Sequence, residues 1–139
     1  MINIDGSYGL GSGQLTRYAL TFSTLSQKAV KITNIRAGRK DPGLKYQHMH
    51  AIKVLQELCN AEATNVTVGA KEVTFKPNEI KGGKVKEDIG TAGSITLLIQ
   101  NIIYPLMFAE KTSKIEITGG TEVSFSPTID YLDKVIFHF

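Results

Sequence analysis

A glycine-rich segment near the N-terminus has the composition of a phosphate-binding turn. Residues 6–14 read Gly-Ser-Tyr-Gly-Leu-Gly-Ser-Gly-Gln and lie between an expected strand and an expected helix. Glycines there let backbone N–H groups approach an anion, and the N-terminus of the helix adds a favourable partial charge. The segment lacks the Gly-Lys-Ser/Thr ending of a P-loop, and its glycine spacing is not that of the dinucleotide fingerprint. It is therefore interpreted either as a phosphate cradle or as a plain tight turn.

A pair of arginines follows the next expected strand. Arg36 and Arg39 flank an Ala-Gly step, and Gly38 allows the chain to fold so that both guanidinium groups converge. A guanidinium offers paired donors that match phosphate oxygens, so two of them would form a fork-like clamp. Arg17, in the first expected helix, would join them. The alternative is that these arginines form ordinary surface ion pairs.

The second expected helix opens with Gln47, His48 and His50. His48 shares a helical stripe with apolar residues, so we expect it to face the interior or a cleft, whereas His50 is offset from that stripe. Nearby guanidinium groups disfavour a charged imidazole, so His48 would act as a neutral hydrogen-bonding group or base. The alternative is a packed core histidine. No metal site is predicted, because no acidic or cysteine ligand accompanies the two histidines.

Gln100 and Asn101 interrupt the most apolar segment of the chain, residues 95–109. The segment, which also contains Pro105, is too short for a membrane span and is expected to form a buried helix. Buried amide side chains need partners, so these two contact either a ligand or neighbouring backbone.

Basic residues are concentrated in one stretch of the sequence. Residues 28–53 carry seven Lys or Arg against Asp41 alone, a local charge of +6 in a chain whose net charge is +3. This distribution favours a surface for phosphate or nucleic acid, or else a solvated basic face. Cys59 is the single cysteine, and the N-terminal residues do not resemble an export signal, so a cytoplasmic location is expected.

The elements that must position these residues form two units. Residues 1–80 are expected to fold as βαβαββ, with Leu15, Tyr18, Ala19 and Phe22 on one face of the first helix. The expected segments are strand 2–4, helix 14–26, strand 30–35, helix 44–60 and strands 65–68 and 72–75.

Residues 81–139 are expected to repeat the pattern, because 80 residues separate Gly13 from Gly93, each before a first helix. The expected segments are strand 85–89, turn 90–94, helix 95–109, strand 114–118 and a helix beginning at Pro127. This second unit would lack its two closing strands. Exposed sheet edges of that kind favour association, so we expect a homo-oligomer or a complementary C-terminal chain.

Several ordered motifs, between Asn3 and about Val135, resemble the RNA 3′-terminal phosphate cyclase family. They are the segments 4–17, 35–44, 47–48, 88–94 and 119–127. The resemblance implies an α+β (α/β) fold of repeated βαβαββ units, as in the carboxyvinyl transferases, with the second repeat truncated here.

The resemblance also implies ATP-dependent conversion of an RNA 3′-phosphate to a 2′,3′-cyclic phosphate, with Mg²⁺ or Mn²⁺. Family members transfer AMP from ATP to an enzyme histidine and then to the RNA phosphate, after which the vicinal 2′-hydroxyl expels AMP. By motif position, the phosphate- and RNA-binding residues would be Arg17, Arg36, Arg39, Gln47 and His48. Gln100 would contact ATP, and Pro127 would lie near the adenine.

Two departures from the family pattern modify these expectations. Leu10 stands where the family usually has a glutamate associated with the divalent cation. The family's nucleophilic histidine lies near the C-terminus of a longer protein, and neither His48 nor His138 occupies a matching motif. This polypeptide alone is therefore expected not to form the enzyme-AMP intermediate.

Two rival interpretations remain. One is a non-catalytic cyclase-like RNA-binding protein of RNA processing or ribosome assembly, and the other is a carboxyvinyl transferase. The first rival departs from the Arg-Ala-Gly-Arg and Gln-His motifs that this chain retains at residues 36–39 and 47–48, so the sequence favours an enzyme.

Overall fold

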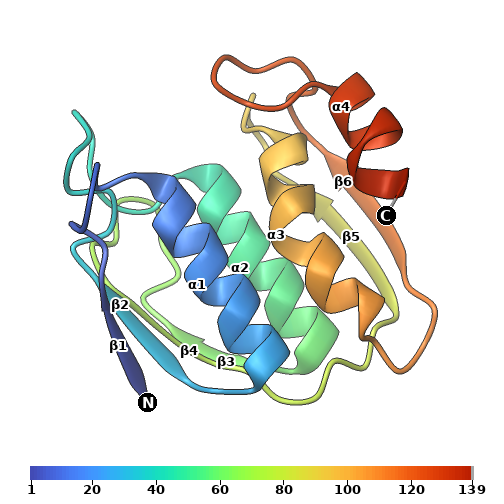
Figure 1. Cartoon of the computed structure of the whole chain (residues 1–139), viewed down its shortest axis with the longest axis horizontal. Coiled ribbons are helices and arrows are strands. Elements are labelled where there is room, and N and C mark those ends of the chain that lie inside the picture. The colour runs from blue at the N-terminus through green and yellow to red at the C-terminus, as the bar shows by residue number, and fades with distance from the viewer. Residues whose placement is uncertain (139) are drawn as a thin grey trace.

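The computed structural model describes residues 1–138 and shows three helices packed side by side between two small sheets (Figure 1). The elements are β1 Ile2–Asp5, α1 Gly13–Ser26, β2 Val30–Thr33, α2 Tyr46–Cys59, β3 Glu62–Thr64, β4 Val73–Lys76, β5 Lys84–Asp88, α3 Ile95–Met107, β6 Lys114–Thr118, α4 Ile129–Lys134 and a 3₁₀ turn, Ile136–His138. Among the described residues, no helix combines the length and apolar character that crossing a membrane requires.

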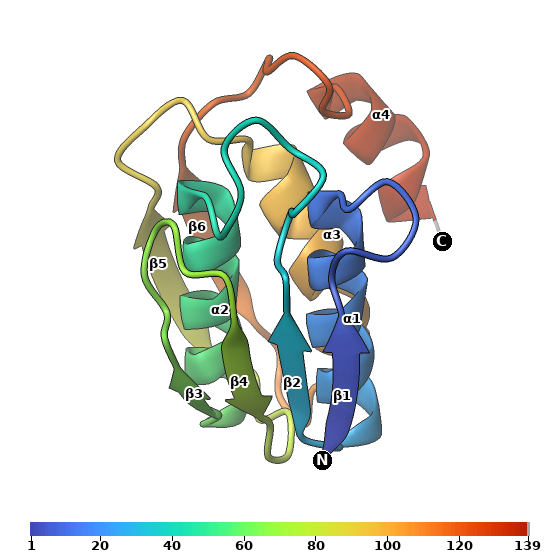
Figure 2. The ribbon, with the colours of Figure 1, turned by 90° about the vertical axis from the view of Figure 1, so that its left-hand side faces the viewer.

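The first sheet has the strand order β1-β2-β4-β3 and is covered on one face by helices (Figure 2). β1 and β2 run parallel, with Ile2 opposite Val30, and the other two pairs are antiparallel. Alternate residues of β2 and β4 are buried beneath the helices, because side chains of a strand point to opposite faces in turn. Val30, Ile32, Val73 and Phe75 form this part of the core.

The second sheet pairs β5 with β6 in parallel, and α3 makes the connection between them. Val85, Ile89, Leu98 and Ile102 belong to the same apolar cluster as the buried residues of the first sheet. α3 contacts both α1 and α2, so the two sheets share one core. Parallel strands place their carboxyl ends at one edge, and the N-termini of α1, α2 and α3 lie at that same end of the molecule (Figure 2).

The predicted mixed α/β fold is confirmed, and the first unit has the expected βαβαββ order. The predicted division at residue 80 stays a prediction, and residue 139, the last of the predicted second unit, lies outside the described residues. Strand 65–68 is wrong: the strand is Glu62–Thr64, because Asn65 has a φ of +60° and residues 67–70 form a turn.

The helix predicted to begin at Pro127 begins instead at Ile129. Thr128 is its N-cap, and the Thr128 hydroxyl accepts a hydrogen bond from the Tyr131 N–H at 3.1 Å. Pro127 therefore precedes the cap rather than occupying the first helical position.

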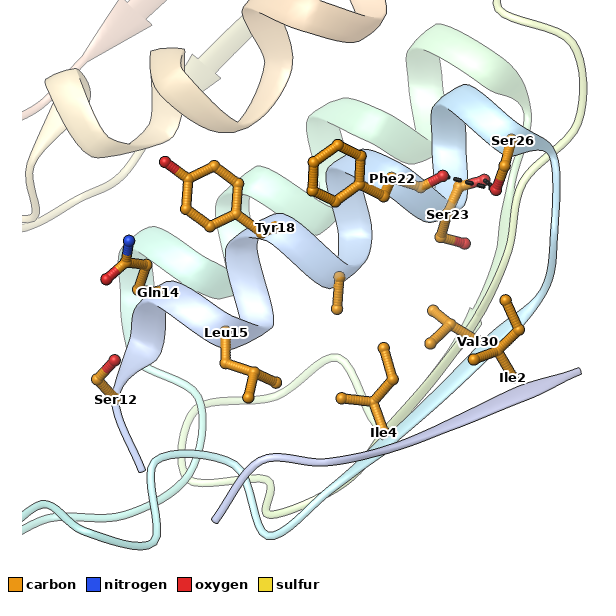
Figure 3. A pocket seen from close by; sticks show the side chains of 11 residues that line it. Ile2, Ile4, Ser12, Gln14, Leu15, Tyr18, Phe22, Ser23, Ser26 and Val30 are labelled. Atoms are coloured by element: carbon orange, nitrogen blue, oxygen red, sulfur yellow. Dashed lines mark hydrogen bonds between the residues drawn. The ribbon is translucent and has the colours of Figure 1, made fainter. Parts of the chain in front are cut away.

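The four residues predicted to share one face of α1 do line one groove, but that face is not the buried one. Of these four residues only Ala19 is buried, whereas Tyr18 is 44% and Phe22 63% exposed. Those two rings stack at 6.1 Å beside an apolar groove that also includes Ile2 and Ile4 of β1 (Figure 3). The buried face carries hydroxyl residues instead: Thr16, Thr21, Ser23 and Thr24.

Three of these four buried hydroxyls, those of Thr21, Ser23 and Thr24, donate to backbone carbonyls, whereas the Thr16 hydroxyl has no partner among the described residues. The Thr24 hydroxyl, for example, donates to the Leu20 carbonyl at 2.9 Å. The apolar stripe therefore identified residues that share a face of α1, but not the face that is buried.

A close approach of two loops orients the segment that carries Arg36. Gly43, buried and with a φ of +87°, donates from its N–H to the Ile35 carbonyl at 2.7 Å. A Cβ atom at Gly43 would overlap the carbonyl group of Gly69. Gly69 also has a positive φ, +84°, but a Cβ atom there would meet nothing within 4 Å.

These two glycines make a matched pair for testing the approach of the loops. Gly69→Ala adds only the cost of a left-handed alanine, about 1–2 kcal/mol. Gly43→Ala adds steric overlap to that cost and is expected to destabilise by roughly 2–5 kcal/mol. Urea unfolding of the two variants measures the difference, and equal losses of stability would show that the loops do not meet at Gly43.

Candidate functional site

A cleft of about 410 Å³ lies at the carboxyl ends of β1 and β2, where ligands of α/β proteins commonly bind. The first unit supplies a wall rich in basic and amide groups: Ser12, Gly13, Gln14, Arg17, Arg36, Arg39, Lys45, Gln47 and His48. The second unit supplies Leu97 and a short run from residue 123 to residue 126.

The glycine-rich turn and the arginine loop are held against each other. The Asp5 carboxylate accepts from the Ser7 N–H at 2.9 Å and from the Asn34 side-chain amide at 3.0 Å. These bonds, the one from the Ser7 N–H above all, lower the pKa of Asp5 below its ordinary value. Gly38 lies so close to Gly11 that neither has room for a side chain. Asp5 and Asn34 were not singled out by the sequence, because an Asp–Gly step reads only as a turn.

The structure brings all three predicted arginines to this cleft. The Arg36 side chain donates from one Nη to the Asp41 carbonyl and, at 3.1 Å, to the Gly43 carbonyl, so its own loop fixes its position. Burial, and then the charge of Arg39, lower the pKa of Arg36, while Asp41 opposes that shift. Burial also lowers the pKa of Arg17, which is half-buried on α1.

The alternative that these arginines form ion pairs is wrong for the described part of the chain. Across residues 1–138, the ion pairs involve lysines and His50 but no arginine. The guanidinium groups therefore face a shared cavity without a neutralising carboxylate, which favours an anionic ligand.

His48 is buried with one ring nitrogen engaged and the other unpaired. The Lys45 N–H donates to Nδ1 at 3.2 Å, so in the neutral ring the proton resides on Nε2. Nε2 has no hydrogen-bond partner and lies against Gly13 at the edge of the cleft. Burial, followed by the charges of Arg17, Arg36 and Lys45, lowers the pKa of His48 from 6.5 to about 3.

A neutral His48 therefore presents an unsatisfied N–H donor close to the guanidinium groups of Arg17 and Arg36. A buried donor without a partner costs about 1–3 kcal/mol, which an oxyanion in the cleft would recover. His48 is both buried, as in the core alternative, and a lining residue of the cleft.

Gln47 connects the two units at the cleft. Its Oε1 accepts from the Ser94 N–H at 3.2 Å, at the start of α3. Because Oε1 is engaged there, the amide N–H₂ group of Gln47 is the part oriented for a ligand. The glycine turn 90–94 that carries Ser94 is in turn bonded to Gly120, whose N–H donates to the Gly93 carbonyl at 2.9 Å.

Neither Gln100 nor Pro127 lines the cleft, although each is close in sequence to a residue that does. Gln100 is half-buried on α3, about one turn beyond Leu97, and Pro127 follows Ser126 directly. Asn101 is buried and pairs with α1, since its backbone carbonyl accepts from the Thr21 hydroxyl at 2.9 Å. The Asn101 side chain itself bonds to no backbone group: its Oδ1 lies 3.4 Å from the Thr21 hydroxyl, and its buried Nδ2 has no hydrogen-bond partner among the described residues.

His50 is a residue that sequence reasoning undervalued. Although offset from the His48 stripe, it is buried, and its Nδ1 forms a hydrogen bond with the Glu87 carboxylate on β5. This contact joins α2 to the second sheet. The helical stripe of α2 was derived from the first unit alone. It therefore could not reveal the face of α2 that packs against the second unit.

Within residues 1–138, no group of three or more His, Cys, Asp or Glu side chains is arranged to hold a metal ion.

The lowered pKa of His48 gives a signed prediction for stability. The unfolded chain binds a proton near pH 6.5 and the folded chain only near pH 3, so stability falls as the pH drops through this window. Between pH 7 and pH 5 the loss is about 2 kcal/mol. His48→Gln keeps an acceptor for the Lys45 N–H and does not titrate, so its stability should lack this component. Chemical denaturation at several pH values measures it, and parallel curves for the two proteins would contradict a buried neutral His48.

Comparison with known proteins confirms the family suggested by the motifs. A family model described as RNA 3′-terminal phosphate cyclase matches residues 8–139. Similar relatives include the RNA 3′-terminal phosphate cyclases of Pyrococcus furiosus and Methanosarcina acetivorans, each 52% identical over 135 residues. These alignments cover 97% of this chain and 40% and 38% of the respective relatives.

The enzyme of the same name from Methanopyrus kandleri is 45% identical over 139 residues, which is 100% of this chain and 40% of that relative. The chain therefore spans about two-fifths of the length of the curated relatives it matches. With its glycine turn, arginine loop and buried histidine gathered at one cleft, the chain belongs to the RNA 3′-terminal phosphate cyclase family.

Proposed function

We propose that this cleft binds the 3′-phosphate of RNA and the phosphates of ATP, for the ATP-dependent conversion of an RNA 3′-phosphate to a 2′,3′-cyclic phosphate. The observation that carries the proposal is the meeting of three guanidinium groups and the unpaired His48 N–H at one cavity. Membership of the cyclase family supplies the reaction class.

The reaction itself explains why a cluster of positively charged and hydrogen-bonding groups would assist catalysis. In the last step the RNA 2′-hydroxyl loses its proton and attacks the adenylated 3′-phosphate. A new O–P bond forms, and the phosphoanhydride bond to AMP breaks, so AMP leaves with the electron pair. Negative charge spreads over the phosphate oxygens during this exchange, and preorganised donors stabilise it more than they stabilise the starting state.

Each basic residue has a defined part in this proposal. Arg36 and Arg39 would hold the RNA phosphate, and Arg17 would reach the same oxygens from α1. The neutral His48 would donate its Nε2–H, and Gln47 its amide N–H₂. Gln100 and Pro127, which are close in sequence to lining residues, would contact ATP and the adenine.

Mg²⁺ or Mn²⁺ would be bound mainly through the ATP phosphates, as is usual in enzymes that act on nucleoside triphosphates. The described residues offer no cluster of acidic or imidazole ligands for it, and Leu10 stands in the glycine turn where a carboxylate would be expected.

The nucleophile of the adenylation step would come from the part of the relatives' length that this chain does not span. The 139-residue chain, incubated with labelled ATP and Mg²⁺, should accordingly yield no acid-labile protein adenylate. Addition of a complementary C-terminal chain should allow the protein adenylate to form. Recovery of an adenylate on residues 1–139 alone would overturn this assignment of the nucleophile.

We extend the proposal to the assembly and location of the protein. The two-stranded sheet β5-β6 has two open edges, and such edges favour pairing with another chain, so a homo-oligomer or a complementary chain is proposed. A cytoplasmic site of RNA processing accords with the use of ATP. Light scattering should give a mass above that of one chain, whereas a clean monomer would contradict self-association.

Selective binding of a 3′-phosphate is the direct test of the cleft. Arg39 and Lys40 are neighbouring, exposed and equally charged, but only Arg39 lines the cavity. Arg39→Ala should weaken binding of 3′-phosphorylated RNA roughly tenfold or more, because one charge-assisted hydrogen-bonding group is lost. Lys40→Ala should change the affinity slightly and equally for 3′-phosphate and 3′-hydroxyl ends.

Fluorescence anisotropy at fixed salt measures both variants with both RNA ends. Equal losses for Arg39→Ala and Lys40→Ala, independent of the RNA end, would indicate only general attraction to the phosphate backbone. A non-catalytic RNA-binding relative, the alternative function, would bind RNA without preference for the phosphorylated end.

A further inference from the structure

The turn after β6 holds an aromatic ring in solvent at the mouth of the cleft. The relative exposure of Phe125 is 104%, and the residue lines the cavity between Ser124 and Ser126. A phenylalanine so exposed adds nothing to the core and leaves its apolar surface in water. Packing among residues 1–138 therefore does not explain its presence at this position.

The backbone at Phe125 makes the residue still more costly to the fold. Its φ is +62°, and the Ser126 N–H donates to the Val123 carbonyl at 3.1 Å across the turn. Phe125 is thus the third residue of a four-residue turn, where a positive φ favours glycine. A left-handed conformation costs a residue with a side chain roughly 1–2 kcal/mol. Strain of this kind is typical of functional positions.

The segment that leads to the turn at Phe125 is bonded to the glycine turn 90–94, which in turn is bonded to the basic side of the cleft. The Gly120 carbonyl accepts from the Ile95 N–H at 3.0 Å, and the Gly120 N–H donates to Gly93. The adjoining Ser94 N–H is bonded to Gln47, which is itself a lining residue. Phe125 is therefore tied, through the second glycine turn, to the helix that carries Gln47 and His48.

An aromatic ring beside a phosphate-binding wall suits a nucleotide. Guanidinium groups hold the phosphate, while an exposed ring offers a flat surface on which a base stacks, as in many proteins that bind single-stranded RNA. The nearby Ser124 and Ser126 hydroxyls add hydrogen-bonding groups for a sugar or base edge.

We propose that Phe125 is the nucleobase-stacking residue of this cleft, with its ring placed against the base of the nucleotide whose phosphate the arginines hold. The inference rests on the proposed function. The base is either that of the RNA 3′-terminal nucleotide or the adenine of ATP, since both present the same flat π surface.

The test compares four variants of the 139-residue chain: Phe125→Ala, Phe125→Trp, Phe125→Gly and Phe108→Ala. Phe108 is an exposed phenylalanine, 71% accessible, at the end of α3, and is the matched control. Affinities are measured for ATP, for a short RNA with a 3′-phosphate, and for the same RNA with an abasic 3′-terminal residue. Thermal melts accompany every variant.

Phe125→Ala should weaken binding of the stacked nucleotide roughly tenfold, whereas Phe125→Trp and Phe108→Ala should bind as the parent does. A loss for RNA that disappears with the abasic end identifies the RNA base, and a loss for ATP alone identifies adenine. Phe125→Gly should relieve the backbone strain and raise the melting temperature while it weakens binding. A residue with a merely structural role would not combine these two effects.

Two negative results are distinguishable. If the Phe125 variants bind both nucleotides like the parent while Arg39→Ala still loses the 3′-phosphate preference, the stacking role is wrong and the proposed function stands. If the parent chain itself neither binds ATP nor prefers a 3′-phosphate, the proposed function fails and the stacking role fails with it.

Discussion

The crowding of positive charge around a buried neutral histidine is the constraint on which the site depends. Arg17, Arg36 and Arg39 line one cavity with His48, and no carboxylate among residues 1–138 pairs with any of the three guanidinium groups. Like charges so placed repel one another. Burial above all, and then the charges of Arg17, Arg36 and Lys45, lower the pKa of His48 and keep its imidazole uncharged. Hydrogen bonds hold the charged groups in place despite this repulsion. The Arg36 guanidinium donates to a carbonyl of its own loop, and a backbone N–H donates to the ring of His48.

The second half of the chain completes the cleft rather than merely adjoining it. Gln47 and His50, both on α2, bond to Ser94 and Glu87 of the second unit. These two contacts set the position of the glycine turn 90–94, and through it the turn that carries Phe125. A displacement of the second unit would therefore alter the opposite wall of the cavity without touching an arginine. Preorganisation of this kind is what electrostatic stabilisation of a phosphate requires.

Much of this arrangement could be predicted from sequence because local patterns specify it. Arg36 and Arg39 follow a strand parallel to β1, so their meeting with the glycine turn follows from the pairing of two parallel strands. The misses have tertiary causes. Thr21 and Thr24 are buried while Tyr18 is exposed, since hydroxyls that bond within a helix can replace apolar side chains at a helix contact. The partner of His50 lies 37 residues away in the second unit, and the positive φ of Phe125 has no signal in residue type, which would favour glycine there.

The central claim is that a neutral His48 offers its Nε2–H to a phosphate oxygen in this cleft. Nitrogen-15 NMR of histidine-labelled chain, titrated with an RNA ending in a 3′-phosphate, observes both ring nitrogens directly. The account predicts that Nδ1 stays unprotonated throughout, while the Nε2–H resonance moves downfield as the 3′-phosphate binds and stays unmoved with a 3′-hydroxyl RNA. A His48 ring that becomes doubly protonated near neutral pH, or an Nε2–H resonance indifferent to the phosphate, would contradict it.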